Sequence, residues 1–112
     1  MKNNYKLKYH LRNYIKQELY DYNRNKQILQ ELSNQKTSQV ATKTLLILTK
    51  KINCIENVYN SLNENDQELF NIIFKNGCSQ LYAKSYYNIT KDMYYNSMNK
   101  IIYKVAQEYE QI

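Results

Sequence analysis

Apolar side chains recur at intervals of three and four residues along most of this 112-residue chain, which is the spacing of one face of an α-helix. The first stripe predicts a helix over about Tyr5–Asp21, and a shorter stripe predicts a second over about Asn25–Ser33. The polar run Ser33–Gln39 has no period and is expected to be a loop. A third stripe predicts a long helix over about Val40–Ser61. The first stripe consists of Leu7, Leu11, Tyr14, Ile15, Leu19 and Tyr22.

The third stripe is the most regular, and it has the spacing of a heptad seam. Its members are Leu45, Leu48, Ile52, Ile55, Tyr59 and Leu62. Such a seam packs either against the first helix of the same chain or against a second copy in a homodimer. Because it is shorter than the three to four heptads that mark a coiled coil, packing within the chain is favoured.

A cap residue and a glycine bound the next helix. Asn63 and Asp66 have the spacing of a capping box, in which a side-chain oxygen accepts hydrogen bonds from the first turn. Leu69, Phe70 and neighbouring apolar residues supply the buried face. Gly77 follows, as expected where the backbone needs a positive φ beyond a helix end.

The last part of the chain predicts a short helix, a turn and a long helix. Ser79 can cap a short helix over about Gln80–Tyr87, and Asn88 suits the left-handed conformation of a turn. Thr90 can cap a final helix over about Lys91–Tyr109.

The composition supports an all-α fold. The chain has a single glycine and no proline, whereas an all-β domain needs turn residues at short intervals. Its length suits one compact unit. We expect residues 1–62 to form an N-terminal helical segment, with a basic arm and a role in packing or dimerisation, and residues 63–112 to form a helix-turn-helix segment.

The net charge of +6 is unevenly distributed along the chain. Basic residues concentrate in the first 26 residues and again between Lys75 and Lys104, whereas the stretch Glu56–Glu68 is acidic. A basic balance of this kind fits a polyanion such as nucleic acid, although a solvated lysine surface gives the same composition.

Several classes of function are not expected from these residues. His10 is the only histidine, and Cys54 and Cys78 lack the spacing of a metal site. No phosphate-binding loop or activated nucleophile is evident, so we expect no enzyme activity, no cofactor and no metal. The N-terminus is polar and no apolar run could cross a bilayer, which predicts a cytoplasmic protein without a membrane partner.

The order helix, turn, short helix, turn, long helix is that of a helix-turn-helix, whose last helix enters the major groove of double-stranded DNA. Tyr94, Met98, either Ile101 or Ile102, and Val105 are expected to form the inward stripe of that helix, and the opposite face is polar. Asparagine can read adenine, lysine can reach guanine or phosphate, and tyrosine can contact thymine methyl groups or phosphate. The predicted DNA contacts are Ser79, Lys84, Thr90, Lys91, Asp92, Tyr95, Asn96, Asn99, Lys100 and Lys104.

Three segments carry a resemblance to a known family. They are LRNYIKQELYDYNRNKQILQEL (Leu11–Leu32), KINCIENVYNSLNENDQELFNIIF (Lys51–Phe74) and NITKDMYYNSMNKIIYKVAQEY (Asn88–Tyr109). Together they resemble the RinA/ArpU/LtrC type of phage late-gene transcriptional activator over nearly the whole chain. The resemblance implies a helix-turn-helix like region 4 of sigma-70 factors, activation of phage late or packaging genes in a bacterial host, and contact with host RNA polymerase.

Two positions depart from the family pattern. Lys84 stands where the family has a small residue, and Asn96 stands where it tends to carry arginine after the tyrosine pair. The second departure implies a weaker phosphate grip on the last helix, or a grip supplied by the basic N-terminal segment. Two other functions stay open: a small terminase-like DNA-packaging subunit, and a helical protein-interaction module that does not bind DNA.

Overall fold

A computed structural model of the chain describes residues 7–34, 39–78, 81–82, 85 and 90–112, with only the backbone described for residues 39–42. Every regular element in these ranges is helical, which confirms the predicted all-α class. No helix in the same ranges combines the length and apolar character that crossing a membrane requires. The elements are α1 (Tyr9–Tyr20), α2 (Tyr22–Ser33), α3 (Gln39–Ser61), α4 (Glu64–Phe70) with a π-helical turn (Asn71–Lys75), and α6 (Lys91–Tyr109).

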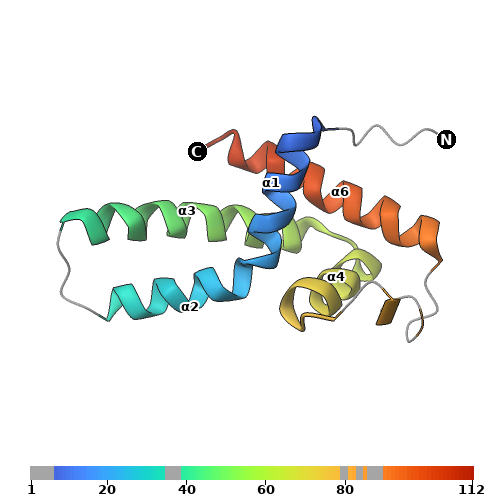
Figure 1. Ribbon diagram of the computed structural model, residues 1–112, viewed down its shortest axis with the longest axis horizontal. Helices are drawn as coiled ribbons and strands as arrows, with labels where there is room; N and C mark the ends of the chain where they lie inside the picture. The colour runs from blue at the N-terminus through green and yellow to red at the C-terminus, as the bar shows by residue number, and fades with distance from the viewer. Residues whose placement is uncertain (1–6, 35–38, 79–80, 83–84, 86–89) are drawn as a thin grey trace.

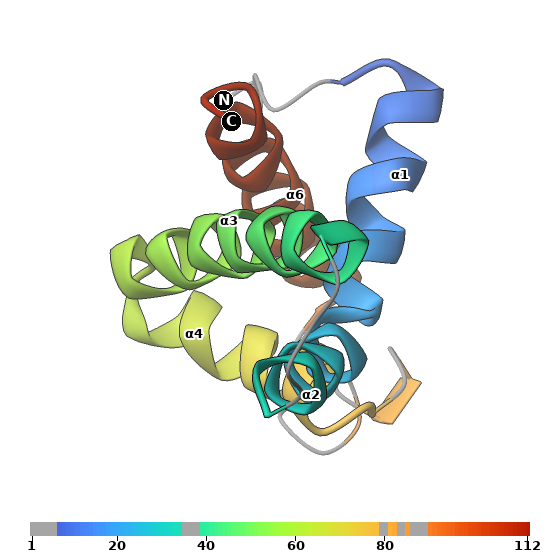
Figure 2. The same ribbon diagram turned by 90° about the vertical axis from the view of Figure 1, so that its left-hand side faces the viewer.

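The helices form a core with a projecting hairpin. Helices α2 and α3 lie side by side and extend away from the other elements, which gives the molecule a long axis of 49 Å (Figures 1 and 2). Helix α1 crosses α6, and α4 lies beneath α3 and α6 (Figure 1). The first two predicted helices correspond to α1 and α2, but the extended antiparallel pair is formed by α2 and α3.

One apolar core draws on both halves of the chain. Its largest fully buried side chains are Ile15, Leu19, Ile55, Leu69, Phe70, Met98, Ile101, Ile102 and Val105. They come from α1, α3, α4 and α6. Residues 1–62 and 63–112 consequently share their buried surface.

Helix α3 is buried only over the C-terminal half of its seam. Ile52 and Ile55 lie in the core, while Leu45 and Leu48 are half-buried. The core beneath Ile52 and Ile55 is formed by this chain's own helices, as the favoured interpretation of the seam predicts. The outer half lies on the projecting hairpin.

The prediction that the whole first stripe is buried is wrong in part. Ile15 and Leu19 are buried as expected, but Leu11 and Tyr14 are exposed. Helix α1 crosses α6 instead of lying along it, so only a short part of the stripe is covered. The helix also begins at Tyr9, not Tyr5, and only Asp21 separates it from α2.

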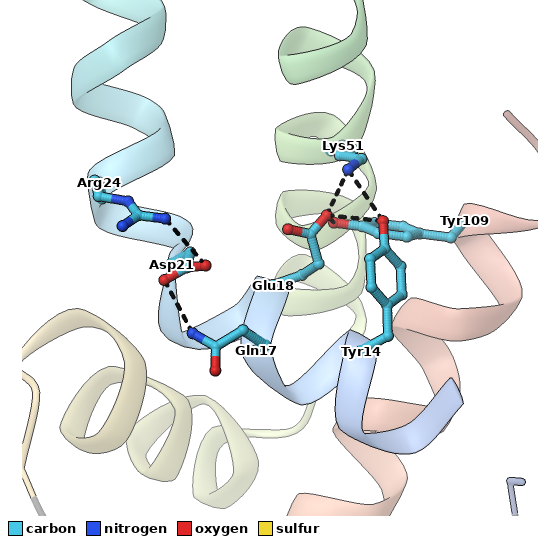
Figure 3. A network of polar contacts seen from close by, with 7 residues as sticks. All are labelled: Tyr14, Gln17, Glu18, Asp21, Arg24, Lys51 and Tyr109. Carbon is cyan, nitrogen blue, oxygen red and sulfur yellow. Dashed lines mark hydrogen bonds and ion pairs between the residues drawn. The ribbon is translucent and has the colours of Figure 1, made fainter. Parts of the chain in front are cut away.

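Side chains stabilise the bend at Asp21. Its carboxylate accepts a hydrogen bond from the Gln17 amide at 3.2 Å and pairs with the Arg24 guanidinium at 3.2 Å (Figure 3). The Asp21 N–H continues the α1 ladder by donating to the Gln17 carbonyl at 2.9 Å. The two helices therefore join without a loop.

The predicted caps of α4 and α6 are present. Asn63 Oδ1 accepts from the Asp66 N–H at 2.9 Å, and Thr90 Oγ1 accepts from the Met93 N–H at 3.1 Å. Gly77 has a φ of 68°, in the left-handed region that glycine enters without strain. Of the predicted short helix over Gln80–Tyr87, only Leu81, Tyr82 and Ser85 fall within the described ranges, where they are helical; the Asn88 turn falls outside them.

The end of α4 widens into the π-helical turn, which periodicity did not predict. The wider turn lets three consecutive residues, Ile72, Ile73 and Phe74, all be buried. Asn23 of α2 donates to the carbonyls of Phe74 and Lys75 at 3.2 and 2.7 Å. A side chain distant in sequence thus satisfies carbonyls that the end of a helix leaves unpaired.

Replacing Ile52 by aspartate should unfold the chain. Ile52 is 4% exposed, so the substitution would bury an unpaired carboxylate and lower the free energy of unfolding by about 4 kcal/mol or more. The matched control is Ile47→Asp on the same helix, where the side chain is 53% exposed and the expected change is about 0.5 kcal/mol. Urea denaturation followed by circular dichroism measures both. A folded Ile52→Asp monomer would show that the seam is an interface between chains.

Candidate nucleic-acid interface

The inner face of α6 determines how the helix is rotated. Tyr94, Met98, Ile101, Ile102 and Val105 are all buried. The predicted inward stripe is therefore confirmed, and both isoleucines belong to it. Of the tyrosine pair, Tyr94 is 4% exposed and Tyr95 is 39% exposed, which confirms that the two rings point in different directions.

The opposite face of α6 carries a polar stripe, which we call the outer stripe. Its members recur at intervals of three and four and are Asp92, Tyr95, Asn96, Asn99 and Tyr103. The first three are exposed, and Asn99 and Tyr103 are half-buried. Tyr103 was not among the predicted contacts, although its position four residues after Asn99 was a usable signal.

The first turn of α6 combines a cation, an anion and an aromatic ring. Lys91 Nζ lies 5.9 Å from the centre of the Tyr95 ring, and that ring meets Tyr94 edge-on at 5.5 Å. Asp92 interacts favourably with the positive end of the helix dipole. Thr90, Lys91 and Asp92 are all exposed at this end of the helix. Ser79 and Lys84 lie outside the described residues.

Asn99 is held by α1. The Arg12 guanidinium donates a hydrogen bond to Asn99 Oδ1 at 2.8 Å. Bidentate recognition of adenine uses both the oxygen and the nitrogen of an asparagine amide. Arg12 would therefore have to release Asn99 before that amide could read a base. Asn96 lies about one turn closer to the helix N-terminus and is exposed.

Lys100 is turned towards α4. Its ammonium pairs with Asp66 Oδ2, and the Ser97 hydroxyl donates to Asp66 Oδ1 at 2.7 Å. Asp66 is 3% exposed, so this carboxylate would otherwise be buried without a counter-charge. The predicted DNA contact at Lys100 is thus engaged in joining α6 to α4.

Lys104 lies on the same side of α6 as Lys100, one turn further along. It lines a shallow groove between α3 and α6, together with Val58, Ser61 and Glu108. The ten predicted contacts are therefore not gathered on one surface. The described ones divide between the first turn and outer stripe of α6 and the side of α6 that faces α4 and α3.

A second polar cluster lies at the other end of α6. The Glu18 carboxylate pairs with Lys51 Nζ at 2.7 Å and accepts hydrogen bonds from the hydroxyls of Tyr14 and Tyr109 at 3.2 and 3.5 Å (Figure 3). Burial, followed by the negative charge of Glu18, raises the pKa of Tyr109. The cluster joins α1, α3 and α6, and its groups are paired with one another.

The described residues offer no metal site, because nowhere among them do three His, Cys, Asp or Glu side chains come together. Cys54 is buried, its Sγ–H donates to the Glu108 carbonyl at 3.6 Å, and burial raises the pKa of its thiol. A buried thiol with a raised pKa is a poor nucleophile.

Removing the Lys100 ammonium should destabilise the fold. Lys100→Ala leaves the buried Asp66 carboxylate with Ser97 alone, and we expect a loss of about 2 kcal/mol in the free energy of unfolding. Lys104→Ala is the matched control, with an expected change of about 0.5 kcal/mol. Adding Asp66→Asn to Lys100→Ala should recover part of the loss. Equal stability of the two single variants in urea denaturation would rule out this role for the ion pair.

The stability of the fold should fall in alkaline solution. Burial, aided by the nearby Tyr20 and Tyr95, raises the pKa of Tyr94 to about 12. An unfolded tyrosine ionises near pH 10, so between about pH 10 and 12 the unfolded state binds fewer protons and gains in relative stability. Tyr94→Phe removes this contribution. Its urea midpoint should therefore fall less between pH 9 and 11 than that of the unaltered protein, and an equal fall in both would contradict the assignment.

Comparisons with known proteins add no further guide to the site. No protein-family model, curated protein or solved structure gives a significant match to the chain. A function must therefore be argued from the residues and geometry described above.

Proposed function

We propose that the chain is a sequence-specific DNA-binding transcriptional regulator that inserts α6 into the major groove, as a helix-turn-helix related to sigma-70 region 4 does. The observation that carries the proposal is the outer stripe, which presents polar side chains on a helix whose opposite face is buried. Because burial of one face fixes the rotation of α6, the same polar side chains always face outward, where they can contact DNA.

The dimensions and chemistry of the stripe suit a groove. From Asp92 to Tyr103 it extends about 16 Å along the helix, which is roughly the length of five base pairs. The major groove accommodates an α-helix, and exposed asparagine and tyrosine side chains can contact adenine and thymine there. The net charge of +6 favours association with a polyanion.

The resemblance to phage late-gene activators extends the proposal. On that basis the regulator would activate late or packaging genes in the cytoplasm of a bacterial host and contact host RNA polymerase. The terminase-like alternative predicts a ring, whose mass would be many times 13.6 kDa in sedimentation.

One observation favours the protein-interaction alternative. Leu46 and Ile47 are adjacent on the projecting α2–α3 hairpin and are 55% and 53% exposed. Exposed neighbouring apolar side chains are a common feature of surfaces that bind other proteins. This surface lies on the hairpin and not on α6, so binding there does not compete with the DNA-binding proposal.

Alanine at Tyr95 or Asn96 should weaken specific DNA binding without unfolding the chain. A duplex selected by the protein from a random pool serves as the probe in fluorescence anisotropy. Each replacement removes one base-edge or methyl contact, so we expect a loss of about 1–3 kcal/mol in binding free energy. Asn53→Ala, at an exposed asparagine of α3, is the matched control and should bind normally.

Stability measurements on the tyrosine pair check the rotation of α6. Tyr94→Ala should cost about 3 kcal/mol or more, while Tyr95→Ala should leave the melting temperature within a few degrees. If the pool yields no selected sequence, or if Asn96→Ala and Asn53→Ala bind equally well, the proposed use of α6 is wrong.

A further inference from the structure

The outer stripe of α6 lacks the positive charge that DNA binding requires. Within the described part of α6, Lys91 and Asp92 offset each other, and Lys100 and Lys104 face α4 and α3. Neutralisation of backbone phosphates supplies much of the affinity of a protein for DNA. If α6 occupies the groove, the cations that grip the backbone must come from another element.

Helix α1 carries such cations on one side. Lys8, Arg12 and Lys16 recur at intervals of four, so they lie one above another along the helix. Lys8 is exposed. Its carbonyl accepts a hydrogen bond from the Arg12 N–H at 2.9 Å, so Lys8 is in register with the first turn of α1. We call these three residues the α1 basic stripe.

The α1 basic stripe lies on the side of α1 that meets the N-terminal half of α6 where the two helices cross. Arg12 donates to Asn99, a member of the outer stripe. Tyr20, two turns after Arg12 on the same side of α1, lies close enough to Tyr94 to help raise its pKa. Lys16 lies between Arg12 and Tyr20 along α1, on the same side of that helix.

The acidic residues in α1 and directly after it do not neutralise this stripe. Glu18 is paired with Lys51 of α3, and Asp21 is paired with Arg24 of α2 (Figure 3). Lys75, another basic residue of the described part, places its ammonium 4.1 Å from the centre of the Tyr59 ring. Among the described residues outside α6, Lys8, Arg12 and Lys16 therefore form a cationic group near the outer stripe that these carboxylates leave uncompensated.

We propose that the α1 basic stripe binds the phosphate backbone of duplex DNA beside the groove that α6 occupies. Arg12 connects the α1 basic stripe to the outer stripe. Its guanidinium donates one hydrogen bond to Asn99 and has further N–H groups that can donate to a phosphate. This inference rests on the proposed function, since it takes α6 as the element in the groove. It assigns the phosphate contacts to specific residues of a helix outside the helix-turn-helix.

The test is the salt dependence of DNA binding by Lys8→Ala/Lys16→Ala. Arg12 is left in place because its loss would also disturb Asn99. Each phosphate contact contributes about 0.9 to the slope of log K against log salt. With a fluorescent mixed-sequence duplex and a potassium chloride series, the double variant should lose up to about 2 from that slope. The matched control Lys43→Ala/Lys50→Ala removes the same charge from exposed positions of α3 and should keep the slope of the unaltered protein.

The possible outcomes separate the two proposals. A lower slope in the α1 variant alone supports the α1 basic stripe. If the unaltered protein binds DNA and the two double variants have equal slopes, the assignment to α1 is overturned while the proposed function stands. If the unaltered protein binds no duplex, both are overturned. Circular dichroism verifies that the variants are folded. Lys8→Ala alone, at the position before α1, should show about half of the reduction in slope that the double variant shows.

Discussion

The buried face of α6 is the constraint on which the rest of the structure depends. Tyr94, Met98, Ile101 and Val105 pack into one core with α1, α3 and α4, so the rotation of α6 cannot change without opening that core. Burial of one face determines which residues form the other. The outer stripe is therefore a consequence of hydrophobic packing. The core fixes the orientation in which this stripe would meet DNA.

Features that depend on neighbouring residues were predictable from the sequence. Both caps, the positive φ of Gly77 and the inward direction of Tyr94 follow from spacing within one or two turns. The exposure of Tyr14 was not predictable in this way, because it depends on the angle at which α1 crosses α6. Local periodicity defines a face, but the position of a neighbouring helix decides how much of that face is covered.

The candidate site was predictable only in part, for the same reason. Asn99 and Lys100 were correctly placed on α6, but their partners lie 87 and 34 positions away in the sequence, at Arg12 and Asp66. A single sequence does not say which distant segments meet, so it could not show that these side chains are engaged within the chain. The Arg12–Asn99 contact joins α1 to α6, and this arrangement is the basis for assigning α1 a part in the interface.

The most direct test of this account is an NMR titration of the isotope-labelled protein with its selected DNA duplex. The account predicts that the largest changes in backbone amide shifts occur over residues 90–99 of α6 and along α1, while residues 43–50 of α3 change little. Changes concentrated on the α2–α3 hairpin, with α6 unaffected, would contradict it, because the interface would then lie on the surface that carries Leu46 and Ile47.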